Sequence, residues 1–73
     1  MIHAAKLETS PRLQRVYSVL RKGAWLSTRD IIERAKVCAV NSAIDELRAP
    51  VNGCDIECRR IGRNWFYRME RAA

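Results

Sequence analysis

The sequence predicts a small α+β fold in which three helices precede a short antiparallel β-hairpin. From residue 11 to residue 49, apolar residues recur at intervals of three and four, which places them on one face of a helix. After a turn signal at residues 50–53, polar and apolar residues alternate and an aromatic-rich run follows, as is typical of strands. A length of 73 residues and an apolar content of 48% allow a single folded domain. We expect it at residues 10–69, between a flexible lead-in at residues 1–9 and a loose end at residues 70–73.

The first helix is expected at about residues 11–22. Ser10 can cap its free backbone amides, and Pro11 suits the first helical position. Gly23 follows where a helix end favours a left-handed residue. The apolar stripe of this helix consists of Leu13, Val16, Tyr17 and Leu20. Residues 24–26 are too few for another helix, so we predict a short strand that could pair with the later hairpin.

The second helix is predicted to begin after Ser27, whose side chain can cap it. Asp30 lies three residues later and takes the place of the acid in a capping box, where it also suits the helix dipole. We expect the helix to end near Ala35, with Ile31, Ile32 and Ala35 on its buried side.

The third helix is expected to begin between residues 37 and 39 and to end at residue 48 or 49, because Pro50 cannot continue it. Its buried residues would be Val40, Ile44 and Leu47, which are four and three residues apart. The helical period places the following residues on the exposed side: Cys38, Ala39, Asn41, Ser42, Asp45 and Glu46.

The hairpin is predicted from strands at residues 55–59 and 65–69, with its tip at residues 61–64. In the first strand, Ile56 and Cys58 alternate with polar residues and would face the core. In the second strand, the residues expected to face the core are Trp65, Tyr67 and Met69.

The chain is basic, with 14 Lys and Arg residues against 8 Asp and Glu residues and a net charge of +6. A small domain of this charge favours a polyanionic partner, most commonly nucleic acid, although solubility alone is the other explanation. Three cysteines without a secretory signal indicate a reducing, cytoplasmic setting. Cys54 and Cys58 would lie about 13 Å apart in one strand, too far for a disulfide.

Other functional classes receive no support from the residues. The single histidine, His3, gives no credible fourth ligand to a zinc site, so we expect neither a metal nor a cofactor. No nucleophile is paired with a base and no glycine-rich phosphate loop is present, so we expect no enzymatic activity. The sequence has no long apolar run for membrane insertion, and no coiled-coil extension that would define an oligomer.

The order of these elements resembles the winged helix-turn-helix family of DNA-binding domains over about residues 9–69, with the two-helix motif at residues 26–47. In that family the second helix of the motif enters the major groove and the hairpin, or wing, reaches a neighbouring groove or backbone. The small size looks similar to that of phage and prophage regulators and excisionases. The resemblance therefore implies a transcriptional regulator that binds double-stranded DNA. The residues expected to contact DNA are Arg29, Lys36, Ala39, Asn41, Ser42, Asp45, Arg48, Arg59, Arg60, Arg63 and Asn64.

Within this interpretation, Asn41 could read an adenine edge and Ser42 could bind a base or a phosphate. The arginines near the hairpin tip suit phosphate or a narrow minor groove, but they could instead protect the strand from edge pairing. The third helix carries two acids, Asp45 and Glu46, and one base, Arg48, which predicts repulsion from phosphate. Either the acids face away from the backbone, or one of them accepts from cytosine, or this helix binds a protein. Besides a transcriptional regulator and a protein-binding adaptor, a third hypothesis is a protein that bends DNA without strong sequence readout.

Overall fold

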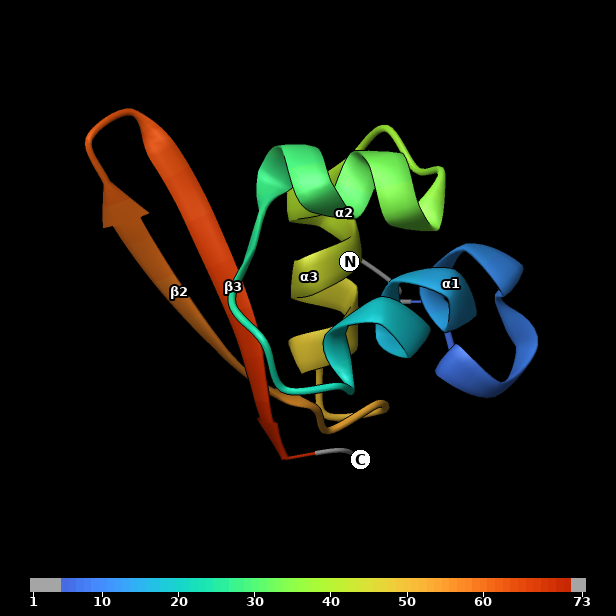
Figure 1. The fold of residues 1–73 in the computed structure, drawn as a ribbon. Helices are drawn as coiled ribbons and strands as arrows, with labels where there is room; N and C mark the ends of the chain where they lie inside the picture. Colours follow the sequence, from blue (N-terminus) through green and yellow to red (C-terminus); the bar gives the residue numbers. More distant parts are fainter. Residues whose placement is uncertain (1–4, 72–73) are drawn as a thin grey trace.

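The computed structural model describes residues 5–71, which form three α-helices and one three-stranded antiparallel sheet (Figure 1). The α+β class and the predicted order of helices and strands are confirmed. The elements are a 3₁₀ helix at Leu7–Thr9, α1 at Pro11–Leu20, β1 at Leu26–Ser27, α2 at Thr28–Ala35, α3 at Val40–Arg48, β2 at Asp55–Ile61 and β3 at Asn64–Arg71.

The sheet has the order β1-β3-β2, so β3 is its central strand. Leu26 of β1 pairs with Tyr67 of β3, which confirms that the short strand joins the hairpin. The hairpin is longer than predicted, because Ile61 and Asn64 still pair and leave a turn of only two residues. Gly62 in that turn has a φ of +63°, a conformation that glycine adopts without strain. Figure 1 shows that the tip of the hairpin stands clear of the helices.

The core lies between the three helices and one face of the hairpin. Its largest fully buried side chains are Leu13, Val16, Leu20, Ile31, Ile44 and Leu47. Ile56, Tyr67 and Met69 cover the core from the sheet, as predicted. Burial of these side chains is the main stabilising term, and the single core of so small a domain supplies at most roughly 3–5 kcal/mol net.

Three predictions of burial were wrong. Ile32 is 40% exposed, because it lies one helical step from Ile31 and so at the edge of the buried stripe of α2. Cys58 and Trp65 are also exposed, the latter by 45%. Both occupy the expected face of their strand, but that face is covered only where the helices lie against it. The outer half of the hairpin extends past the helices.

Side-chain caps define two helix starts. The Ser10 hydroxyl accepts a hydrogen bond from the Leu13 amide, which begins α1. Ser27 and Asp30 form a complete capping box, each side chain accepting from the other's backbone amide at 3.0 Å. The hydrogen bond from the Ser27 amide, followed by that with its hydroxyl, lowers the pKa of Asp30. At its other end α2 stops at Lys36, which adopts a left-handed conformation with φ 57°.

The segment predicted as a flexible lead-in contains ordered contacts in the part that the structure describes. The Asn52 side chain accepts from the Leu7 amide at 2.7 Å and donates to the Ala5 carbonyl at 2.8 Å. It also donates to the Glu46 carbonyl at the end of α3. Residues 1–4 lie outside the described residues. At the other end β3 continues to Arg71, so the predicted loose end overlaps this strand, and residues 72–73 again lie outside the description.

Candidate nucleic-acid interface

One side of α3 is free of the core. Ala39, Asn41, Ser42 and Asp45 are exposed, whereas Val40, Ala43, Ile44 and Leu47 are buried beneath them. The predicted division of this helix into two faces is therefore confirmed. The exposed face offers a carboxamide, a hydroxyl and a carboxylate, all of which can bond to polar groups of another molecule.

The two acids of α3 lie on different sides of the helix. Glu46 is half-buried and forms an ion pair with Arg12 of α1, so its charge is compensated inside the domain. Asp45 is exposed on the same side as Asn41. At the end of the helix, Arg48 lies near β2, where one of its guanidinium nitrogens is 3.7 Å from the Cys58 sulfur. Among the described side chains, Asp45 forms no ion pair, so the exposed face carries one uncompensated carboxylate there rather than two.

A hydrogen bond joins the exposed face of α3 to the central strand. The hydroxyl of Tyr67 donates to Oδ1 of Asn41 at 2.8 Å. Tyr67 itself is only 4% exposed, so a residue of the core holds the side chain of the exposed Asn41.

The surface between α3 and the hairpin is hollow, and Trp65 borders it. One hollow is lined by Asn41, Ile44, Asp45, Cys58, Trp65 and Tyr67. A second, at the start of α3, is lined by Thr28, Cys38, Ala39, Val40, Asn41, Ser42 and Trp65. A third, between α2 and the hairpin tip, is lined by Ser27, Thr28, Arg29, Arg63, Asn64, Trp65 and Phe66. We call these three hollows together the concave surface. It brings the start of α2, the exposed face of α3 and the hairpin tip to one side of the molecule.

The strand register divides the hairpin arginines between two faces. Arg60 pairs with Trp65, two residues along from the pair formed by Cys58 and the buried Tyr67, and so lies on the same face, toward α3. Arg59 pairs with Phe66 and lies on the opposite, outer face. Alternation along a strand therefore separates two neighbouring arginines that the sequence analysis had grouped as one cluster.

On the outer face the charges already have partners. The guanidinium groups of Arg59 and Arg68 lie 4.7 and 4.9 Å from the ring centroid of Trp25, within the range of cation–π attraction. Arg68 also forms ion pairs with Glu57 at 2.6 Å and Glu70 at 3.3 Å. The proximity of the two carboxyl groups, together with Arg68, lowers the pKa of Glu57, and the neighbouring Glu57 carboxyl raises the pKa of Glu70. Arg59 therefore lies on the face away from the concave surface and is not placed to contact a ligand there.

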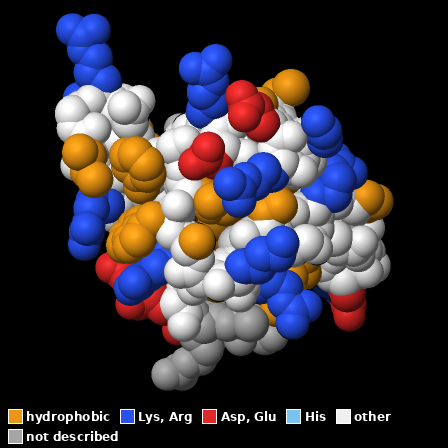
Figure 2. Space-filling view, in the orientation of Figure 1, with side chains coloured by type: hydrophobic (Ala, Val, Ile, Leu, Met, Phe, Trp, Pro, Cys, Tyr) orange, Lys and Arg blue, Asp and Glu red, His pale blue; other side chains and the backbone are white. Residues whose placement is uncertain are grey.

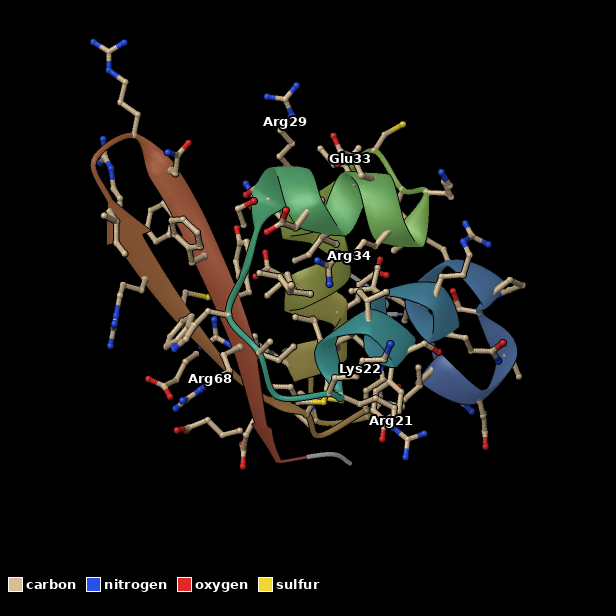
Figure 3. All side chains as sticks on the ribbon, viewed as in Figure 1. Arg21, Lys22, Arg29, Glu33, Arg34 and Arg68 are labelled. Carbon is tan, nitrogen blue, oxygen red and sulfur yellow. The ribbon has the colours of Figure 1, made fainter. Side chains whose placement is uncertain are left out.

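The cations around the concave surface have weaker partners. Arg29 forms an exposed pair with Glu33 at 3.5 Å, and Figure 3 shows its side chain pointing away from the helices. At the tip, Arg60 borders none of the three hollows, and its Nε donates to the Gly62 carbonyl at 3.1 Å. Arg29, Arg63 and Asn64 border a common hollow, so the structure brings these three predicted residues together. Lys36 is exposed in the turn between α2 and α3 but borders none of the three hollows.

A different group of cations lies over α1 and α2. Figure 1 looks onto these two helices with α3 behind them, and Figure 2 shows Lys and Arg side chains on the same near face. Arg21, Lys22 and Arg34 are exposed there and are labelled in Figure 3. Within residues 5–71, no ion pair of these three cations is formed. They provide a natural comparison for the cations of the concave surface.

Trp65 was not predicted as a surface residue, because the strand face that it shares with Tyr67 and Met69 was assigned to the core. A detectable signal was the close spacing of Trp65 to the tip, since residues next to a protruding turn have little chance of cover. The separation of Arg59 from Arg60 could also have been found, because strand alternation alone places neighbours on opposite faces.

Comparisons with protein-family models, curated proteins and solved structures found no match. In the described part of the chain, no helix is long and apolar enough to cross a membrane. Nor do the side chains of residues 5–70 include a group of three His, Cys, Asp or Glu residues that could hold a metal ion. The interpretation of the concave surface therefore rests on its own residues.

Proposed function

We propose that this chain is a winged helix-turn-helix domain that binds double-stranded DNA and acts as a small cytoplasmic transcription regulator, similar in type to those of phages. In this proposal α3 enters the major groove, and the β2–β3 hairpin is the wing that contacts the flanking backbone. One observation carries the proposal: the exposed face of α3 and the hairpin tip border the same concave surface. A duplex that meets the helix would then also meet the wing.

The chemistry of the surface supports the same proposal. A major groove about 12 Å wide accepts one helix, and Asn41 and Ser42 supply the polar groups that base edges require. Arg60 and Arg63 on the wing and Arg29 on α2 supply the positive charge that phosphate contacts need. The pairing of Glu46 with Arg12 removes one source of repulsion that the sequence had suggested.

The test compares two double variants that lose the same charge. Arg60→Ala with Arg63→Ala removes two cations of the wing, whereas Arg21→Ala with Lys22→Ala removes two cations from the α1 face. Affinity for a duplex pool is measured by fluorescence anisotropy at several salt concentrations. The wing variant is expected to bind more weakly and to reduce the slope of log affinity against log salt by about 2, since each lost phosphate contact reduces it by about 0.9.

The α1-face variant is expected to stay close to the wild type in both affinity and slope. Equal losses in the two variants would mean that binding follows net charge and not the concave surface. No binding of the wild type at low salt would contradict the proposal as a whole.

A protein-binding adaptor is the second candidate, because Asp45 is uncompensated and Trp65 is 45% exposed on the same surface. Exposed aromatic residues are enriched in protein interfaces. A pull-down that recovers a stable protein partner through the concave surface, with no retention of duplex at low salt, would favour this candidate. Equal affinity for unrelated duplexes would instead favour an architectural, excisionase-like role.

A further inference from the structure

Asn41 differs from an ordinary exposed asparagine because its side-chain oxygen is hydrogen-bonded to a residue of the core. Its Oδ1 accepts the Tyr67 hydroxyl hydrogen bond at 2.8 Å, while Asn41 itself is exposed as the second residue of α3. The backbone of Tyr67 pairs with Leu26 on one side and with Cys58 on the other. With the residue 4% exposed, its hydroxyl has a fixed position in the fold.

The orientation of a carboxamide decides whether it presents a hydrogen-bond donor or an acceptor to another molecule. One end of the group accepts hydrogen bonds and the other donates them, and a half-turn of the side chain exchanges the two. A free asparagine can present either end to a base edge. Because the phenol binds Oδ1 of this exposed side chain, the two N–H donors of Nδ2 are the groups left to bind another molecule. The reversed amide would require the phenol oxygen to accept, which is the weaker part of its hydrogen-bonding capacity.

We propose that Tyr67 is a positioning residue that makes Asn41 a reader of hydrogen-bond acceptors. This inference rests on the proposed function, because it concerns the base that α3 meets in the major groove. An outward Nδ2 favours a base whose groove edge presents an acceptor, such as N7 of a purine or O4 of thymine. It disfavours cytosine, whose N4 presents a donor there. Tyr67 thereby contributes to base preference without contacting DNA.

The test selects bound duplexes from a randomised pool and sequences them. The wild type is expected to deplete cytosine at one position by roughly tenfold, within the range that a base-edge hydrogen-bonding pair supplies. Asn41→Ala identifies that position, because its preference there is lost. Tyr67→Phe removes only the hydroxyl and is expected to reduce the depletion to about twofold, leaving the other positions unchanged. Tyr17→Phe, which removes a hydroxyl from a helix with no residue in the concave surface, is expected to retain the wild-type pattern.

The outcomes separate this inference from the function on which it rests. If the wild type enriches no sequence, the regulatory proposal and this inference both fail. If it enriches a sequence but Tyr67→Phe retains the same cytosine depletion, only the inference fails. A Tyr67→Phe variant that loses preference at every position would point to a general structural role and would also overturn the inference.

A measurement without DNA tests the geometry directly. The two Asn41 side-chain amide protons are observed by ¹H–¹⁵N NMR in the wild type and in Tyr67→Phe. Loss of the hydroxyl is expected to shift both protons while the backbone amides of α3 remain in place. Unchanged side-chain signals would mean that the hydroxyl does not hold Asn41, and the inference would be overturned.

Discussion

At the residue scale, Lys36 holds a backbone conformation that its side chain does not favour. Among residues 5–71 it is the one non-glycine residue with positive φ, at 57°, and it ends α2. The left-handed conformation costs an ordinary residue about 1–2 kcal/mol, of which the greater freedom of unfolded glycine would offset part. Lys36→Gly is therefore expected to raise the free energy of unfolding by about 0.5–1 kcal/mol, measured by urea denaturation.

The control for this prediction is Lys36→Ala, which loses the same charge but keeps the strained backbone. It is expected to stay within about 0.5 kcal/mol of the wild type. A glycine variant no more stable than the alanine variant would contradict the prediction. The sequence predicted where α2 ends but not this strain, because lysine gives no sign of a left-handed position.

Residue burial could be predicted from the sequence where a period is sampled over several turns. The buried stripes of α1 and α3 were predicted correctly because several apolar residues repeat at the helical spacing along each helix. Ile32, Cys58 and Trp65 were misassigned for another reason. Their periodic position is close to that of buried residues, but burial also requires a second element to cover them. That second condition depends on packing and has no local sequence signal.

At the element scale, α3 carries two acids in different surroundings. Asp45 faces the concave surface and Glu46 pairs with Arg12, so removing each charge should have a different effect. Asp45→Asn is expected to raise duplex affinity roughly threefold at low salt, because it removes a repulsive charge from the proposed interface. Glu46→Gln is expected to leave affinity unchanged and to lower the free energy of unfolding by about 0.5–1 kcal/mol. The measurements are anisotropy titration and urea denaturation. Equal effects on affinity would mean that α3 is not oriented as proposed.

The capping box of α2 gives stability that depends on pH. Hydrogen bonds from the Ser27 backbone amide and with its hydroxyl hold the pKa of Asp30 below its usual value. Because the folded pKa is lower than the unfolded one, this stability is present above the usual aspartate pKa of about 3.9 and is lost as the pH falls further. Asp30→Asn is expected to be less stable than the wild type at pH 7, and the difference should shrink toward pH 3. Thermal unfolding at several pH values checks this, and a difference independent of pH would contradict it.

The sequence predicted this element well because capping is local: Ser27 and Asp30 lie three residues apart and need no other element. It predicted the hairpin less well, placing the tip at residues 61–64 where the turn is residues 62–63. The paired length of two strands depends on the twist and register of the whole sheet. Those features set how far the hairpin extends and which of its residues form the turn.

At the scale of the whole molecule, Asn52 joins three distant parts of the chain. Its side chain bonds to Leu7 and Ala5 before α1 and to the Glu46 carbonyl at the end of α3. The sequence indicated only a turn here, because a partner 45 residues away leaves no local pattern. Residues from the expected lead-in are thus fixed against the end of the proposed reading helix.

Asn52→Ala removes all three of these hydrogen bonds at a half-buried site. It is expected to lower the free energy of unfolding by about 2 kcal/mol, since each such bond contributes roughly 1 kcal/mol or less when partly exposed. The core of a domain of this size supplies at most roughly 3–5 kcal/mol of net stability. A loss of about 2 kcal/mol is a large fraction of that, so the urea midpoint should fall clearly. Hydrogen exchange should show that the Leu7 amide loses protection first. The matched variant Asn64→Ala, at the exposed hairpin tip, is expected to change stability by less than about 0.5 kcal/mol. If Asn52→Ala matched it, the contacts of residues 5–9 would add nothing to the stability of the fold.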